Sequence, residues 1–200
     1  MPLTPTDPFE LEKAIWTEED FDQMGWHDVH IHAIAFSTVT HELLLDIDYM
    51  FAWVDPEAPE VHYTFWMAPC TLVFANVHSF AAEIETGLGL EVSHVEREDA
   101  GRPKNADYIK REKEWKWTFN CQEGVFSFHA VGYQQITRSR PVRAKSQSFE
   151  WEGRGGVSFA RCPYDQTDSE QARMVVPTSA SVFNASPPFN LNPAINAGPR

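Results

Sequence analysis

Histidine and aspartate residues recur at alternating positions in two neighbouring segments of the chain. The first segment, residues 25–36, reads GWHDVHIHAIAF, and the second, residues 41–54, reads HELLLDIDYMFAWV. If they pair as an antiparallel hairpin with residues 38–40 as the loop, His32 faces Asp46 and His30 faces Asp48. Side chains that face each other across such a pair have Cβ atoms about 5 Å apart.

These four residues also share one face of the predicted hairpin, because they all have even numbers and strand side chains alternate between the two faces. Imidazole and carboxylate groups are ligands of Zn²⁺, Mn²⁺ and Fe²⁺. The spacing therefore predicts a candidate divalent-metal site made of His30, His32, Asp46 and Asp48. The alternative is a cross-strand charge pair on a solvated sheet face, with no metal and no other cofactor.

The elements that would carry these residues are β-strands. In residues 43–53 the apolar side chains recur at every second position, which is typical of a half-buried strand. Two further runs, residues 61–68 and 71–77, have strand composition, and we interpret Pro69 between them as a bend or an edge marker. Two later runs, EWKWTFN and VFSFHAVGY, are separated by a short segment that contains Gly124, which predicts a hairpin, and Gly132 suggests a bulge.

About eight such strands with short connections predict an all-β fold, a mainly antiparallel sandwich or open barrel. The side chains expected inside it are Leu45, Ile47, Tyr49, Trp53, Phe74, Trp117 and Phe128. One short helix is expected at residues 18–24, with Thr17 as its N-cap, an acidic first turn and Gly25 at its end.

The length of 200 residues predicts one domain, which we place at residues 1–161. Residues 162–200 are rich in Pro, Ser and Asn and have no sustained apolar periodicity. Such a segment buries too little apolar surface to offset its ordering entropy, so we expect an irregular, flexible tail.

Charge is distributed unevenly along the chain, whose net charge is −13. Residues 1–60 contain fourteen Asp and Glu against one base, Lys13, whereas residues 101–161 contain twelve Lys and Arg against six acids. An acidic chain is repelled by phosphate backbones, so nucleic acid is not an expected partner. The acidic part predicts instead a surface that attracts a basic protein.

Several other classes of protein are disfavoured. The longest apolar run is six residues, against about 20 for a membrane-spanning helix, and the N-terminal residues do not resemble a secretory signal, so we expect a cytoplasmic protein that does not enter membranes. Three widely spaced cysteines indicate reduced thiols. No nucleophile elbow, phosphate-binding loop or H-E-x-x-H motif is present, which favours a non-enzymatic role.

Three strings carry a resemblance to a protein family: LLLDIDYMFAWV, YTFWMAPCTLVFANV and VFSFHAVGYQQITRSRPVRAKSQS. Together they resemble a family of small bacterial proteins of unknown function, with an L-D-I-D-Y strand followed by an A-P-x-T-L-x-F segment. The resemblance covers roughly residues 25–149, departs from the pattern at Tyr133, where the family has Phe, and excludes the tail. It implies an all-β domain and a bacterial origin and assigns no activity.

Three functions stay open on these observations. The first is a binding or regulatory module, similar to an immunity protein, whose acidic face meets a basic protein partner. The second is a metal-dependent hydrolase that uses the His and Asp cluster. The third is a carrier whose aromatic residues line a cavity for a small ligand.

Overall fold

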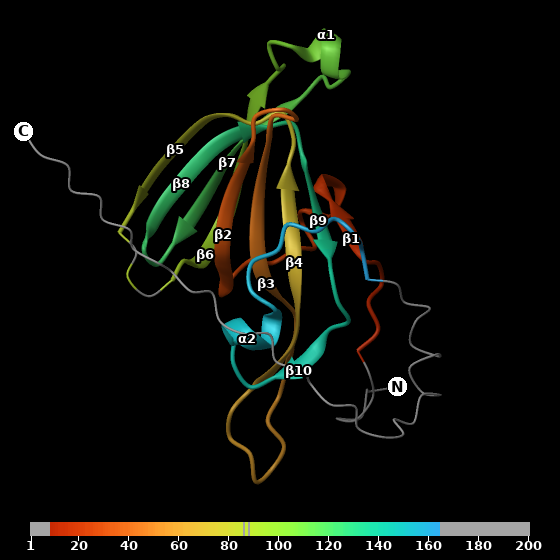
Figure 1. Cartoon of the computed structure of the whole chain (residues 1–200), viewed down its shortest axis with the longest axis vertical. Helices are drawn as coiled ribbons and strands as arrows, with labels where there is room; N and C mark the ends of the chain where they lie inside the picture. The colour runs from red at the N-terminus through yellow and green to blue at the C-terminus, as the bar shows by residue number, and fades with distance from the viewer. Residues whose placement is uncertain (1–8, 86, 88, 165–200) are drawn as a thin grey trace, which may run out of the picture. The chain divides into compact units, whose positions relative to one another are not determined.

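The computed structural model describes residues 9–85, 87 and 89–164, which all belong to one compact unit (Figure 1). Its ten strands are β1 (Ile15–Thr17), β2 (Val29–Ser37), β3 (Glu42–Val54), β4 (Thr64–Phe74), β5 (His78–Ile84), β6 (Glu91–Gly101), β7 (Glu114–Cys121), β8 (Gly124–Ala130), β9 (Tyr133–Thr137) and β10 (Val142–Ala144). The helical elements are η1 (Glu18–Asp20), α1 (Ala106–Ile109) and α2 (Trp151–Arg154). None of the helices in these residues has the length and apolar character needed to cross a membrane.

All ten strands belong to one antiparallel sheet, which confirms the predicted β architecture. The order is β1-β9-β4-β3-β2-β6-β7-β8-β5, and β10 pairs with β4 beside this path. The sheet is open, with β1 and β5 at its two edges, and it curls so that distant strands pack on each other (Figure 1). Phe74 on β4 contacts the rings of Trp117 on β7 and Phe128 on β8, with centroids 5.0 and 4.7 Å apart.

The core lies on the inner face of this curled sheet and is rich in aromatic rings. Six of the seven side chains expected inside are buried there: Leu45, Ile47, Tyr49, Phe74, Trp117 and Phe128. The prediction for Trp53 is wrong, because this residue is 54% exposed. A bulge between Met50 and Ala52 breaks the alternation of β3, and the Trp53 ring packs on Phe65 at 5.0 Å near the end of the strand.

The opposite face of β3 is also buried, and this was not expected. Every residue from Leu43 to Met50 is buried, so the strand has no solvated face there. Residues 146–161, named here the covering segment, lie over it: the backbone N–H of Phe149 and of Ser158 donate to Asp48 and Asp46. Figure 1 shows this segment, with α2, passing in front of β3 and β4.

Two other local predictions differ from the structure. Residues 64–74 form one strand that runs through Pro69, whose carbonyl accepts the backbone N–H of Arg138 at 3.0 Å. Gly132 lies between β8 and β9 and does not form a bulge within one strand. Its φ of 155° suits glycine, and a Cβ there would overlap the carboxylate of Glu18.

The helix expected at residues 18–24 is not confirmed, because only the three-residue 3-10 helix η1 forms there. Asp20 accepts the backbone N–H of Thr17 at 2.8 Å and pairs with Lys13, so its carboxylate holds a tight turn. Most of the predicted tail, residues 165–200, lies outside the described residues. At its start, the backbone N–H of Tyr164 donates to the carbonyl of Thr137 at 2.7 Å.

The difference between Phe128 and Trp53 gives a prediction about stability. Phe128→Ala should lower the free energy of unfolding by about 3–5 kcal/mol, because it removes a fully buried ring from a packed core. Trp53→Ala removes a larger but half-exposed ring and should cost less than half as much. Urea unfolding followed by circular dichroism measures both, and equal losses would contradict the assignment of the core face.

Candidate functional site

The structure tests the pairing of the four predicted ligands. His30 is the register partner of Asp48, as expected, but a bulge between Ile31 and Ala33 shifts the rest of the hairpin, and Asp46 faces Ala33. The expected pairing of His32 with Asp46 is therefore wrong. His32 Nε2 lies 2.8 Å from Asp48 Oδ2 instead.

His30 turns toward a different neighbour. Its Nε2 lies 3.5 Å from Glu91 Oε2, on the adjacent strand β6. Of the four predicted ligands, the structure thus brings His32 and Asp48 into contact. His30 pairs with Glu91, and Asp46 pairs with arginines.

Asp46 and Asp48 are fully buried, and each of their four oxygens accepts a hydrogen bond. Asp46 Oδ1 accepts from Arg138 Nη2 at 2.6 Å and from Arg154 Nη2 at 2.7 Å. Its Oδ2 accepts from Arg154 Nη1 at 2.8 Å and from the backbone N–H of Ser158 at 2.9 Å. Arg154, whose side chain is also fully buried, therefore holds this carboxylate with a two-pronged contact.

Asp48 has a similar environment. Its Oδ1 accepts from Arg154 Nε at 3.1 Å, and its Oδ2 contacts His32 and accepts the backbone N–H of Phe149 at 2.8 Å. We name these two carboxylates with Arg138, Arg154 and His32 the ionic cluster. It links β2, β3, the end of β9 and the covering segment.

Electrostatics of the cluster follow from two opposing effects. Burial raises the pKa of Asp46, but hydrogen bonds from Arg154, the Ser158 backbone and Arg138 outweigh it, and the pKa is lowered. Burial likewise opposes ionisation of Asp48, and its contacts with His32 and Phe149 lower the pKa. Both residues are therefore held as carboxylates, matched by two guanidinium groups.

These contacts bear on the predicted metal site without testing it. A cation bound by Asp46 and Asp48 would replace hydrogen bonds from Arg138 and Arg154, which already carry the compensating charge. The contacts support a structural role for the two carboxylates. Metal binding by His30, His32, Asp46 and Asp48 stays a prediction.

Sequence reasoning missed the two arginines of the cluster. Arg154 lies 108 positions after Asp46, so no local spacing relates them. The signal that could have found them is the charge distribution, since an acidic segment and a basic segment of one chain can neutralise each other. The side chain of Arg154 is fully buried and that of Arg138 nearly so, which shows that part of the basic segment serves the interior.

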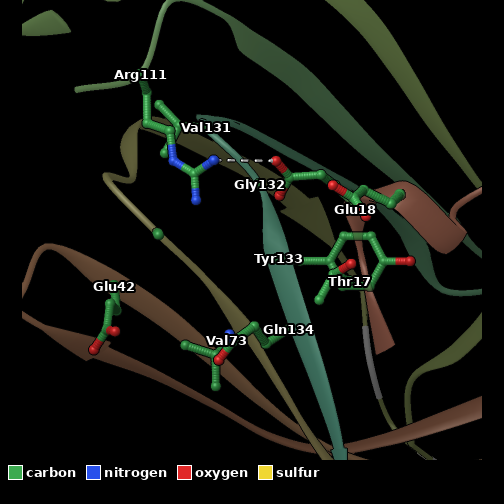
Figure 2. Close-up of a pocket in the computed structure, with 11 residues that line it drawn as sticks. Thr17, Glu18, Glu42, Val73, Arg111, Val131, Gly132, Tyr133 and Gln134 are labelled. Atoms are coloured by element: carbon green, nitrogen blue, oxygen red, sulfur yellow. Dashed lines mark ion pairs between the residues drawn. The ribbon is translucent and has the colours of Figure 1, made fainter. Parts of the chain in front are cut away.

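A second candidate site is an open hollow of about 410 Å³. It lies between η1, the first residue of β3, the last residues of β4 and residues 131–134 (Figure 2). Three glutamates line it, Glu18, Glu19 and Glu42, against one basic residue, Arg111. Figure 2 shows the guanidinium of Arg111 directed toward the Glu18 carboxylate, at 3.9 Å.

The three glutamates of the hollow are not equally neutralised. Glu42 pairs with Arg161 at 2.6 Å, and its pKa is lowered. The pKa of Glu18 is raised, because its burial outweighs the attraction of Arg111. Glu19 is exposed and forms no ion pair within the described part of the chain. The hollow therefore holds carboxylate charge that its own residues leave incompletely compensated.

Comparisons with known proteins do not identify a relative. No family profile matches the chain, and no curated protein or solved structure is significantly similar to it.

The ionic cluster predicts a large difference between two arginines. Arg154→Ala should lower the free energy of unfolding by about 3–5 kcal/mol, because it leaves two carboxylates buried with too few partners. Arg161→Ala removes an exposed pair with Glu42 and should cost about 1 kcal/mol or less. Chemical denaturation compares the two, and Arg154→Lys should recover only part of the loss because it cannot make the two-pronged contact.

The lowered pKa values of Asp46 and Asp48 predict an acid-labile fold. Both carboxyl groups ionise more easily in the folded state than in the unfolded state, where their pKa is about 3.9. Above that pH, their ionisation therefore stabilises the fold. The stabilisation is lost as the pH falls through their lower pKa in the folded state. The free energy of unfolding should fall below about pH 4. Asp48→Asn should show a shallower acid decline than the wild type, and identical slopes would contradict the linkage.

Proposed function

We propose that the protein is a non-enzymatic binding module that holds a basic protein partner at the acidic hollow. The observation that carries the proposal is the incompletely compensated charge of Glu18 and Glu19 at an open surface hollow. An arginine or lysine side chain of the partner supplies the missing counter-charge. The proposal includes the cytoplasmic, immunity-like role expected from the sequence.

Chemistry of the hollow supports this type of ligand. A cation that approaches Glu18 is attracted strongly, because the carboxylate is partly shielded from water. Its own basic neighbour, Arg111, is 3.9 Å away, which is longer than a hydrogen bond. Glu19 is exposed and lines the same hollow, so its carboxylate is accessible to the same cation. A guanidinium group fits such a pair because it offers several donors in one plane.

Exposed acidic residues support attraction of a basic partner over longer distances. Four acidic residues near the start of the described chain are exposed and form no ion pair within it: Glu10, Glu12, Glu19 and Asp22. Asp46, Asp48 and Glu42, by contrast, are neutralised internally. The loop between β3 and β4 carries three further exposed acids without an ion pair in the described chain, Asp55, Glu57 and Glu60. Both regions attract a basic partner, but of the two only residues 10–22 include glutamates that line the hollow, Glu18 and Glu19.

The carrier and hydrolase functions have less support. The inner aromatic rings contact one another, as Phe119 and Phe126 do at 4.7 Å, so they form a packed core. A hydrolase that uses the ionic cluster would have to displace its arginines. Neither function has an observation comparable to the charge of the hollow.

Neutralising the hollow tests the proposal. A labelled oligoarginine peptide serves as the probe, and its binding is followed by fluorescence anisotropy. The double variant Glu18→Gln, Glu19→Gln should bind it about tenfold more weakly, which corresponds to about 1.4 kcal/mol. Raising the salt concentration should slow association with the wild type, because exposed charges are screened.

The matched control is Glu57→Gln, Glu60→Gln, which removes the same charge from the loop between β3 and β4. This variant should retain nearly all the affinity of the wild type. An equal loss in both double variants would show that only net charge attracts the peptide, and the hollow would then have no special role.

A further inference from the structure

Two histidines and a glutamate meet on three adjacent strands, away from the hollow and the ionic cluster. His129 on β8 is the register partner of His78 on β5. On its other side it faces Lys116 of β7, and Glu114 lies two residues before that lysine on the same face. One ligand atom from each of the three residues lies within 4.8 Å of the others.

Distances within this group suit ligands of one metal ion. His78 Nε2 lies 2.9 Å from Glu114 Oε2, and His129 Nδ1 lies 3.8 Å from Glu114 Oε1. The two imidazole rings are stacked with centroids 4.9 Å apart. Two ligands of tetrahedral Zn²⁺, each at about 2.0–2.1 Å, are about 3.4 Å apart, which lies between the two distances.

An independent observation concerns the ring nitrogen Nδ1 of His129, which faces this group. His129 Nδ1 is buried and has no hydrogen-bond partner among the described residues. Buried polar atoms almost always have a partner, and an absent ion is one recognised reason for an exception. The atom lies too far from Glu114 for a hydrogen bond and close enough to share an ion with it.

A neighbouring hydroxyl positions His78 for binding, and among the described residues no arginine or lysine pairs with Glu114. His78 Nδ1 lies 3.0 Å from Ser79 Oγ, and this contact orients the ring so that Nε2 meets the glutamate. Glu114 is only 6% exposed, and within the described chain its ion pairs are with these two histidines alone. Unlike Asp46 and Asp48, it has no arginine that a metal ion would have to displace.

We propose that His78 Nε2, His129 Nδ1 and the Glu114 carboxylate bind one divalent transition-metal ion, with Zn²⁺ as the best match. Two imidazoles and a carboxylate without a thiolate form a donor set that zinc accepts. The side chain of His78 is 47% exposed, so solvent reaches the site and a water molecule completes the coordination. This inference is independent of the proposed binding function.

Titration with Zn²⁺ tests the site on full-length protein that carries no histidine tag. Calorimetry should show one equivalent bound, and Zn²⁺ should raise the melting temperature, because a ligand of the folded state stabilises it. His78→Ala and His129→Ala should each weaken the affinity at least tenfold. Co²⁺ in place of Zn²⁺ should give visible absorption that both variants lose.

The control is the double variant His62→Ala, His94→Ala, which removes two exposed histidines that belong neither to this group nor to the ionic cluster. It should bind Zn²⁺ as the wild type does. No stoichiometric binding by the wild type would overturn the proposal, and so would binding that survives in both His78→Ala and His129→Ala. Because His78 is half exposed, its variant should fold even if changes at buried Glu114 do not.

Discussion

Burial of two carboxylates in the middle of β3 is the constraint on which much of the structure depends. Asp46 and Asp48 can stay ionised there only if cationic groups reach them, because an unpaired charge away from water is very unfavourable. Arg138, at the end of β9, and Arg154, in the covering segment, meet this need. The segment is thus held by charge pairing as well as by the apolar contacts of Phe149 and Phe159.

This constraint makes the two halves of the sheet different. In the half around β3 and β4, aromatic packing fills one face and the covering segment hides the other. In the half formed by β5, β7 and β8, the inner face carries the aromatic core, while outer side chains such as Lys116 and His129 reach solvent. A histidine site on this outer surface is accessible to water. The buried carboxylates of the ionic cluster are not.

Sequence reasoning recovered what depends on local alternation. The inward position of Leu45, Ile47 and Tyr49 follows from a period of two. The hairpin of β7 and β8 and the partnership of His30 with Asp48 follow from that period together with a short connecting loop. It failed where one extra residue enters a strand. The bulge after Ile31 moved His32, and the bulge after Met50 moved Trp53, and neither has a glycine to reveal it.

Contacts between distant residues were also beyond reach. His78, Glu114 and His129 are separated by 36 and 15 positions along the chain, and only the strand order places them together. The hollow requires η1 and residues 131–134 to be neighbours. Charge segregation along the sequence was visible, but two interpretations were possible: attraction to another protein or neutralisation within the chain. The structure contains neutralisation within the chain, at the ionic cluster. The remaining charge at the hollow supports the proposed attraction to another protein.

The long distance along the sequence between Asp46 and Arg154 also has a consequence for synthesis on the ribosome. Strands β2 and β3 emerge long before Arg138 and Arg154, which follow Asp46 by 92 and 108 positions. During that interval the two aspartates must remain hydrated, so the outer face of β3 cannot close. Closure of this face therefore waits until nearly all the described chain has been made.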